Sequence, residues 1–206
     1  LPWERCQYSE LAKTVKSAIS IPVIAVGRIE PADGERLIAE NSCDFVAMGR
    51  QLLADPELPN NLINDSPEKI RPCINCFVCV AQNFWNGEPV CAVNPRLGNY
   101  EEKVEVPKKL KNVVIVGAGP SGLECARMAS NRGHKVTLLE QTRSLGGTAL
   151  FSSLTTPKNG ELINWFERIL KDSEVVIRKN FLADSKSIMS FDPDVVVIAT
   201  GSQSSK

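Results

Sequence analysis

The chain has 206 residues, enough for one large domain or two small ones, and its 24 Lys and Arg residues balance 24 Asp and Glu residues. The absence of net charge gives no electrostatic support for nucleic acid or a membrane surface as a partner, so we expect a small-molecule substrate and leave the oligomeric state open. Seven cysteines without a secretory signal or a long apolar run predict a cytoplasmic, reducing location, where thiols serve metal or redox chemistry.

The first third of the chain alternates helix and strand patterns. We expect helices at 9–19 and 31–41 and strands at 21–26 and 44–48. Unbroken apolar strands separated by amphipathic helices are typical of a parallel sheet that is covered on both faces. The predicted fold class is therefore α/β.

Both of these strands run into a glycine followed by an arginine, Gly27-Arg28 and Gly49-Arg50. Ligands of parallel α/β sheets bind at the carboxyl ends of the strands. Glycine lets the backbone approach a ligand closely, and arginine supplies a forked positive charge. The pattern favours a phosphate site, and the alternative is two ordinary turns with solvated arginines.

Residues 54–71 combine turn signals with a short helix, and a cysteine pattern follows them. It reads Cys73-x2-Cys76-x2-Cys79-x11-Cys91. A triplet at short spacing with a fourth thiolate from a loop is the ligand set of a [4Fe-4S] cluster. Structural zinc is the alternative, although zinc more often takes two separated pairs or a Cys/His mixture. Phe84 and Trp85 lie inside the segment and either shield a cluster or fill a core.

A polar stretch at 99–110 predicts a linker, and a second α/β unit follows it. We expect strands at 113–116, 135–139, 175–177 and 194–198, and helices at 120–131 and 159–171. The turn between the first strand and helix reads Gly117-x-Gly119-x-x-Gly122.

This glycine motif has the context of a dinucleotide site. It follows a strand, opens a helix and precedes an acid, Glu140, at the end of the next strand. The glycines would permit a tight turn, close approach of a pyrophosphate and close helix packing, while Glu140 would accept hydrogen bonds from ribose hydroxyls. That carboxylate would repel a 2'-phosphate, so the site favours FAD or NAD over NADP. A Rossmann-like unit without a nucleotide is the alternative.

With these pieces in this order, the chain resembles the iron–sulfur flavoprotein branch of the old yellow enzyme family, which includes 2,4-dienoyl-CoA reductase, 2-enoate reductases and trimethylamine dehydrogenase. The resemblance implies that residues 1–55 are the last two β/α units of an FMN-binding TIM barrel. It makes residues 56–98 a cluster-binding segment, 99–110 a linker and 111–206 the first part of an FAD-binding domain.

The resemblance also assigns site residues. It implies that Gly27, Arg28, Gly49 and Arg50 hold the FMN phosphate, and that Cys73, Cys76, Cys79 and Cys91 ligate a [4Fe-4S] cluster. The residues that would line the FAD site are Gly117, Gly119, Ser121, Gly122, Glu140 and Thr148. Thr148 departs from the pattern, because glutamine often follows the preceding glycine pair in these reductases.

The implied activity is an electron relay from NAD(P)H through FAD and the cluster to FMN, which reduces an activated C=C bond. One alternative is an amine dehydrogenase with the reverse flow and ADP in the second domain. The other is a zinc-stapled nucleotide-binding module without catalysis. The catalytic residues are unknown, because only two of the eight barrel strands are expected here. We expect both ends to be cut from a longer chain and the 206 residues alone to be inactive.

Overall fold

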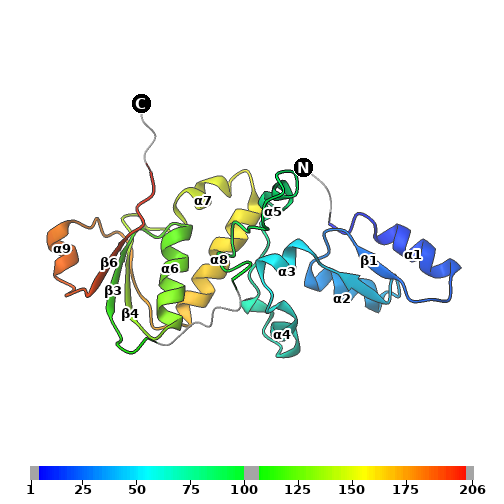
Figure 1. The fold of residues 1–206 in the computed structure, drawn as a ribbon, viewed down its shortest axis with the longest axis horizontal. Helices are drawn as coiled ribbons and strands as arrows, with labels where there is room; N and C mark the ends of the chain where they lie inside the picture. Colours follow the sequence, from blue (N-terminus) through cyan, green and yellow to red (C-terminus); the bar gives the residue numbers. More distant parts are fainter. Residues whose placement is uncertain (1–4, 100–106, 203–206) are drawn as a thin grey trace. The chain divides into compact units, whose positions relative to one another are not determined.

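The computed structural model describes residues 5–99 and 107–202, and both of its units alternate helices with strands (Figure 1). The chain divides into two compact units, residues 1–56 and residues 57–206. The linker expected at 99–110 falls largely on residues 100–106, which lie outside the described residues. The four-part domain division expected from the sequence stays a prediction.

The first unit is built around a pair of parallel strands. Ile24 lies opposite Phe45, and Val26 lies opposite Ala47. All four expected elements of this region are present, with strands shorter than expected. Its elements are α1 (Ser9–Ala18), β1 (Ile24–Val26), α2 (Pro31–Ala39), β2 (Phe45–Ala47) and α3 (Arg50–Ala54).

Helix α2 shows why the sequence forms these elements where it does. Pro31 occupies the first turn, and the preceding Glu30 forms a reciprocal capping box with Asp33. Asp33 also accepts a hydrogen bond from Arg5 at 2.6 Å. Burial alone would raise the pKa of Asp33, but the hydrogen bonds from Arg5 and from the Glu30 backbone outweigh it and lower that pKa.

Only one face of the two-stranded sheet is covered among the described residues. Ala25 packs there with Leu37 of α2 and Ala12 of α1. On the other face Ile24, Val26 and Phe45 are each more than half exposed. The expectation of a sheet covered on both faces is therefore wrong for this unit, because successive strand side chains alternate in direction and both helices pack on the Ala25 side.

The second unit contains a four-stranded parallel sheet in the order β5-β4-β3-β6. If the strands of this unit are numbered along the chain, their order in the sheet is 3-2-1-4. This is the order of a Rossmann-type sheet, in which the direction of strand addition reverses between strands 1 and 4. The two central strands are almost wholly buried. The strand bounds are β3 (Asn112–Val116), β4 (Lys135–Leu139), β5 (Val176–Arg178) and β6 (Val195–Ile198).

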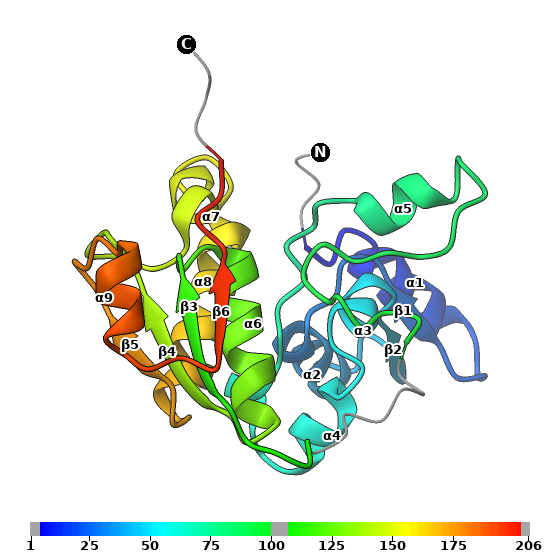
Figure 2. The same cartoon turned by 60° about the vertical axis from the view of Figure 1, so that its left-hand side comes forward.

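Two long helices pack beside this sheet. Helix α6 contacts β3 and β4, and α8 contacts α6 (Figures 1 and 2). Both were expected, whereas two short helices were not. Helix α8 begins two residues earlier than expected and buries Trp165 together with Leu162 and Phe166. The bounds are α6 (Pro120–Asn131), α7 (Gly147–Ser152), α8 (Pro157–Lys171) and α9 (Ser185–Met189).

Residues 57–99 add short elements to the second unit. They form α4 (Leu58–Ile63), the 3-10 helix η1 (Pro67–Lys69) and α5 (Val78–Gln82). Helix α8 contacts η1, so this region packs against the helices beside the four-stranded sheet.

None of the helices in the part of the chain that the structure describes has the length and apolar character to cross a bilayer.

Candidate dinucleotide site and cysteine loop

The glycine turn between β3 and α6 places its three glycines in three different environments. Gly117 has a φ of +101°, and a Cβ there would lie 2.4 Å from the Ala199 carbonyl oxygen. A Cβ on Gly122 would lie 1.9 Å from the Gly117 carbonyl oxygen, whereas a Cβ on Gly119 would meet nothing within 4 Å. Two glycines are thus required by close backbone packing, and the third leaves open space at the amino end of α6.

Glu140 is buried at the end of β4 and is bonded to the glycine turn. Its Oε2 accepts a hydrogen bond from the Ala118 backbone N at 2.9 Å. Its Oε1 accepts from the Thr142 backbone N and hydroxyl at 2.8 and 2.9 Å. Glu140 therefore positions the turn. Its expected contact with ribose hydroxyls stays a prediction. The carboxylate could accept a further hydrogen bond in addition to these three.

The loop after β4 packs directly against the glycine turn. The Gly146 backbone N donates to the Ala118 carbonyl at 2.8 Å. A Cβ on Gly147 would lie 3.2 Å from the Gly119 Cα. Helix α7 starts at Gly147, so the amino ends of α6 and α7 meet next to Gly119. Ser121 and Thr148, in the first turns of these helices, are both exposed to solvent.

The end of β6 completes this edge of the sheet. The Ala199 backbone N donates to the Val116 carbonyl at 2.8 Å, and Gly201 follows with a φ of +76°. The turn therefore lies at the carboxyl ends of the paired strands β3 and β6, where the strand order reverses, which is the position at which open α/β sheets bind their ligands. The structure brings Gly117, Gly119, Gly122 and Glu140 together with the loop that carries Thr148.

The four cysteines of the pattern lie on one segment, residues 72–92, which we name the cysteine loop. All four are reduced cysteines that form no disulfide; Cys76 is exposed and the other three are partly buried. Among residues 5–99 and 107–202, no three His, Cys, Asp or Glu side chains converge closely enough to hold a metal ion. The sulfurs thus form no preformed site for a single ion, whereas a cuboidal cluster takes each thiolate at a different iron atom.

The backbone of the cysteine loop turns sharply around Cys76. Both of its flanking residues, Asn75 and Phe77, have left-handed φ values of +54° and +62°. An aromatic residue in this region is uncommon and costs about 1–2 kcal/mol. Such strain concentrates at functional sites, and turns of alternating hand gather backbone N–H groups around anions, including iron–sulfur centres. The donor set and the backbone therefore fit a cluster.

Phe84 and Trp85 do not fill a core, because they are 81% and 79% exposed. That they shield a cluster stays a prediction.

Cysteines outside the quartet are set apart by their surroundings. Cys6 and Cys43 are buried in the core of the first unit. Burial and the neighbouring Asp33 raise the pKa of the Cys6 thiol. Burial and the neighbouring Glu124 likewise raise the pKa of the Cys125 thiol.

The two Gly-Arg turns follow neighbouring parallel strands and so share one edge of the first unit's sheet. Gly27 has a φ of +130°, and a Cβ there would lie 2.7 Å from a ring carbon of Tyr8. Gly49 precedes α3 with no heavy atom within 4 Å of its missing Cβ, and Arg50 is the first helical residue. Arg28 and Arg50 are both half-buried. The open backbone at Gly49 and the two arginine-bearing turns at the same edge fit a phosphate. That this phosphate belongs to FMN stays a prediction.

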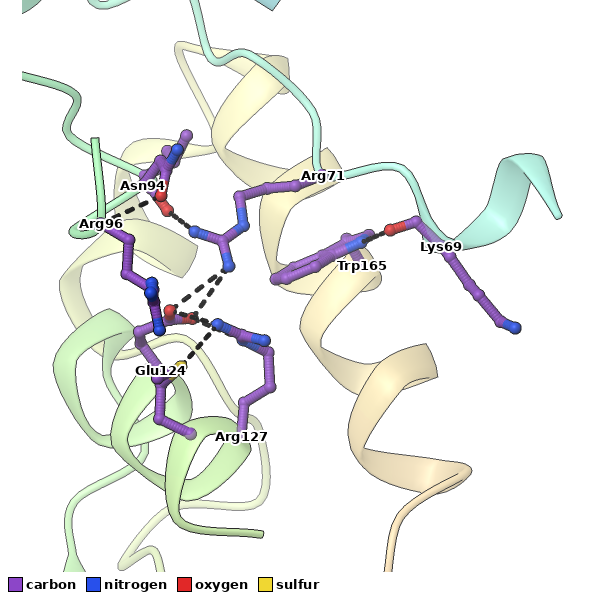
Figure 3. A network of polar contacts seen from close by, with 9 residues as sticks. Lys69, Arg71, Asn94, Arg96, Glu124, Arg127 and Trp165 are labelled. Carbon is purple, nitrogen blue, oxygen red and sulfur yellow. Dashed lines mark hydrogen bonds and ion pairs between the residues drawn. The ribbon is translucent and has the colours of Figure 1, made fainter. Parts of the chain in front are cut away.

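The structure also presents polar residues that the motifs did not identify. Arg71, Glu124 and Trp165 form one network beside the cysteine loop (Figure 3). For Trp165 a signal was available, because it continues the apolar helical spacing of Leu162 and Phe166. No local pattern distinguishes a buried arginine from a solvated one.

Fold and site together define a chain of two parallel α/β units, the second of which carries a Rossmann-type dinucleotide-binding turn. Residues 2–69 match the NADH:flavin oxidoreductase / NADH oxidase family, and residues 115–175 match the NAD(P)-binding Rossmann-like domain. A cinnamate reductase of Clostridium sporogenes is 40% identical over 95% of this chain and 30% of its own length.

Solved structures agree with this relationship. The chain superimposes on a 2-naphthoyl-CoA reductase with a TM-score of 0.93 and 33% identity, covering 99% of this chain and 32% of that one. A histamine dehydrogenase from Rhizobium sp. 4-9 gives a TM-score of 0.93 and 29% identity over 98% of this chain and 31% of that one. The resemblance seen in the sequence is confirmed: this chain is a relative of the NADH:flavin oxidoreductases and spans about a third of the length of the relatives it matches.

Proposed function

We propose that the full-length protein is a flavin- and iron–sulfur-dependent oxidoreductase that passes electrons from NAD(P)H through FAD and a [4Fe-4S] cluster to FMN. The substrate would be a small molecule with an activated C=C bond, such as an enoate, a dienoyl-CoA or an enone. The observation that carries the proposal is that one compact unit combines a cysteine quartet with a Rossmann-type glycine turn, within a chain related to reductases of this family.

The residues of the second unit would bind the FAD. Gly119 and the amino ends of α6 and α7 would receive the pyrophosphate, because backbone N–H groups and helix dipoles attract negative charge there. Ser121 and Thr148 offer hydroxyl groups in the first turns of these helices. Glu140 would position the glycine turn and accept hydrogen bonds from the ribose, and its charge would disfavour a 2'-phosphate.

The cysteine loop would hold the cluster through Cys73, Cys76, Cys79 and Cys91. A bound cluster supplies transfer of single electrons between flavins that accept electron pairs. In the first unit, Gly49 would let the backbone approach the FMN phosphate, Gly27 would let its turn pack against the Tyr8 ring beside that site, and Arg28 and Arg50 would supply charge.

The proposal is tested on the full-length protein purified without oxygen. We expect one FMN, one FAD and about four iron and four sulfide per chain, with broad absorbance near 400 nm. A Cys76→Ser substitution should lower the iron content, whereas Cys125→Ser, a matched cysteine outside the quartet, should leave it unchanged. A colourless protein with one zinc ion would contradict the proposal and support the zinc-stapled module.

A second candidate is an amine dehydrogenase, favoured by the similarity to histamine dehydrogenase. In this case the second unit would hold ADP and the electrons would leave toward an external acceptor. Release of the bound nucleotides by acid, followed by chromatography, separates the candidates. ADP in place of FAD would support the dehydrogenase.

A further inference from the structure

Arg71 joins the two ends of the cysteine loop. It lies two residues before Cys73 and is buried, with 7% of its surface exposed. Its Nη1 donates a hydrogen bond to the carbonyl oxygen of Val93, two residues after Cys91. A single side chain therefore closes the stretch of chain that carries all four cysteines.

The same guanidinium group also contacts α6 and α8, the two long helices of the second unit. Its Nη2 lies 3.3 and 3.4 Å from the two carboxylate oxygens of Glu124, one turn into α6. The Cζ atom of Arg71 lies 4.8 Å from the ring centre of Trp165 on α8. The Trp165 Nε1 in turn donates to the Lys69 carbonyl at 2.8 Å, just before the cysteine loop. Figure 3 shows the Arg71 guanidinium between Asn94, Glu124 of α6 and Trp165 of α8.

These contacts require arginine rather than any cation. A buried charge is costly unless it is paired and hydrogen-bonded, and removing one partner is strongly destabilising. The planar guanidinium can donate in two directions while its face lies against an aromatic ring. A lysine ammonium at position 71 is a compact point charge and cannot hold the Val93 carbonyl, Glu124 and the Trp165 ring together.

Glu124 is shared with a second arginine that provides a natural control. Arg127 donates to both Glu124 carboxylate oxygens at 2.7 and 2.9 Å and lies 6.0 Å from the Trp165 ring centre. Arg127 contacts Glu124 and Met128 on α6 and Trp165 on α8. The two arginines thus share a carboxylate and an aromatic ring, and Arg71 alone also bonds to Val93.

We propose that Arg71 is a positioning residue, which closes the cysteine loop and fixes it to the helix that begins at the glycine turn. Its importance for electron transfer rests on the proposed function, because the loop would then hold the cluster at a fixed place relative to the dinucleotide. The fixing of the loop itself depends only on the contacts of Arg71, Val93, Glu124 and Trp165.

The test compares Arg71→Lys with Arg127→Lys in the full-length protein, using hydrogen exchange resolved by peptide. Arg71→Lys should speed exchange in residues 72–92 by about tenfold, with less than about twofold change for Arg127→Lys. Unchanged protection of residues 120–131 shows that the domain is folded. Glu124→Gln approaches the contact from α6 and should also speed exchange in the loop, which keeps the test available if Arg71→Lys does not fold.

A spectroscopic measurement distinguishes positioning from simple stabilisation. In the reduced protein, the electron paramagnetic resonance lines of the cluster should broaden in Arg71→Lys and stay narrow in Arg127→Lys, because only the first lets the loop take several conformations. Unchanged loop exchange in both Arg71→Lys and Glu124→Gln, or equal acceleration by Arg127→Lys, would overturn the proposal. A protein without iron would overturn the proposed function instead, and exchange in the metal-free protein would still decide the role of Arg71.

Discussion

At the residue scale, Gly119 and Gly122 lie in one turn of the chain but have opposite surroundings. The position of a Cβ at Gly122 is occupied by the backbone of Gly117, whereas the corresponding position at Gly119 is open. The two glycines therefore separate the structural requirement of the turn from its proposed role in ligand binding.

A pair of alanine substitutions uses this difference. Gly122→Ala should destabilise the protein by about 1–3 kcal/mol even without nucleotide, because backbone atoms must move to admit the methyl group. Gly119→Ala should leave the nucleotide-free protein within about 1 kcal/mol of wild type and lower its FAD content. Thermal unfolding and flavin content measure the two effects, and equal destabilisation by both substitutions would contradict this division of roles.

Asp33 makes the start of α2 depend on pH. The pKa of its carboxyl group is held below its ordinary value of 3.8, so the ionised form adds stability above that value, which is lost as the pH falls through the folded-state pKa. Asp33→Asn should therefore speed hydrogen exchange in residues 31–39 at about pH 6, and its difference from wild type should shrink as the pH falls below 3.8 and through the folded-state pKa. Glu35→Gln on the exposed side of the same helix is the control and should match wild type at both pH values.

At the element scale, α8 anchors the region before the cysteines through Trp165. This side chain is 4% exposed and donates to the Lys69 carbonyl, whereas Trp85 in the cysteine loop is 79% exposed. We expect Trp165→Ala to cost about 3–5 kcal/mol and Trp85→Ala less than about 0.5 kcal/mol. Urea unfolding followed by circular dichroism measures both, and a large loss for Trp85→Ala would show that its side chain is packed after all.

The elements that the sequence predicts well are those with a local physical signal. The glycine turn with Pro120 marks the start of α6, and unbroken Val and Ile runs mark β3 and β6. The helices α7 and α9 were missed because six or five residues are too short for an amphipathic period. The exposed face of β1 and β2 was missed because an apolar run indicates that a strand can be covered, and only its tertiary neighbours decide whether it is.

For the candidate site, the sequence predicts those residues whose types are chemically unusual at their spacing, namely the glycines, Glu140 and the cysteines. It missed Arg71 because its partners Glu124 and Trp165 are distant in sequence, and such contacts leave no periodic pattern. The structural role of Glu140 was missed for a similar reason, since its bond to Ala118 depends on the pairing of β3 and β4.

At the scale of the whole molecule, the proposed relay requires the cysteine loop as the only path between the two flavins. In full-length Cys76→Ser protein, NADH should still reduce the FAD, while FMN reduction should slow by at least about 100-fold, because loss of a ligand removes the one-electron carrier. Stopped-flow absorbance separates the two flavins. Dithionite should reduce the FMN in the variant and restore substrate reduction, and normal FMN reduction by NADH would show that the cluster is not on the path.

The bare face of the β1–β2 pair has a practical consequence for handling these 206 residues alone. Ile24, Val26 and Phe45 form an exposed apolar patch on a sheet that has two strands among the described residues. Exposed apolar patches of separate molecules associate in water. Sedimentation of the isolated chain should therefore depend on concentration, and replacing Phe45 with a charged residue should keep it dispersed.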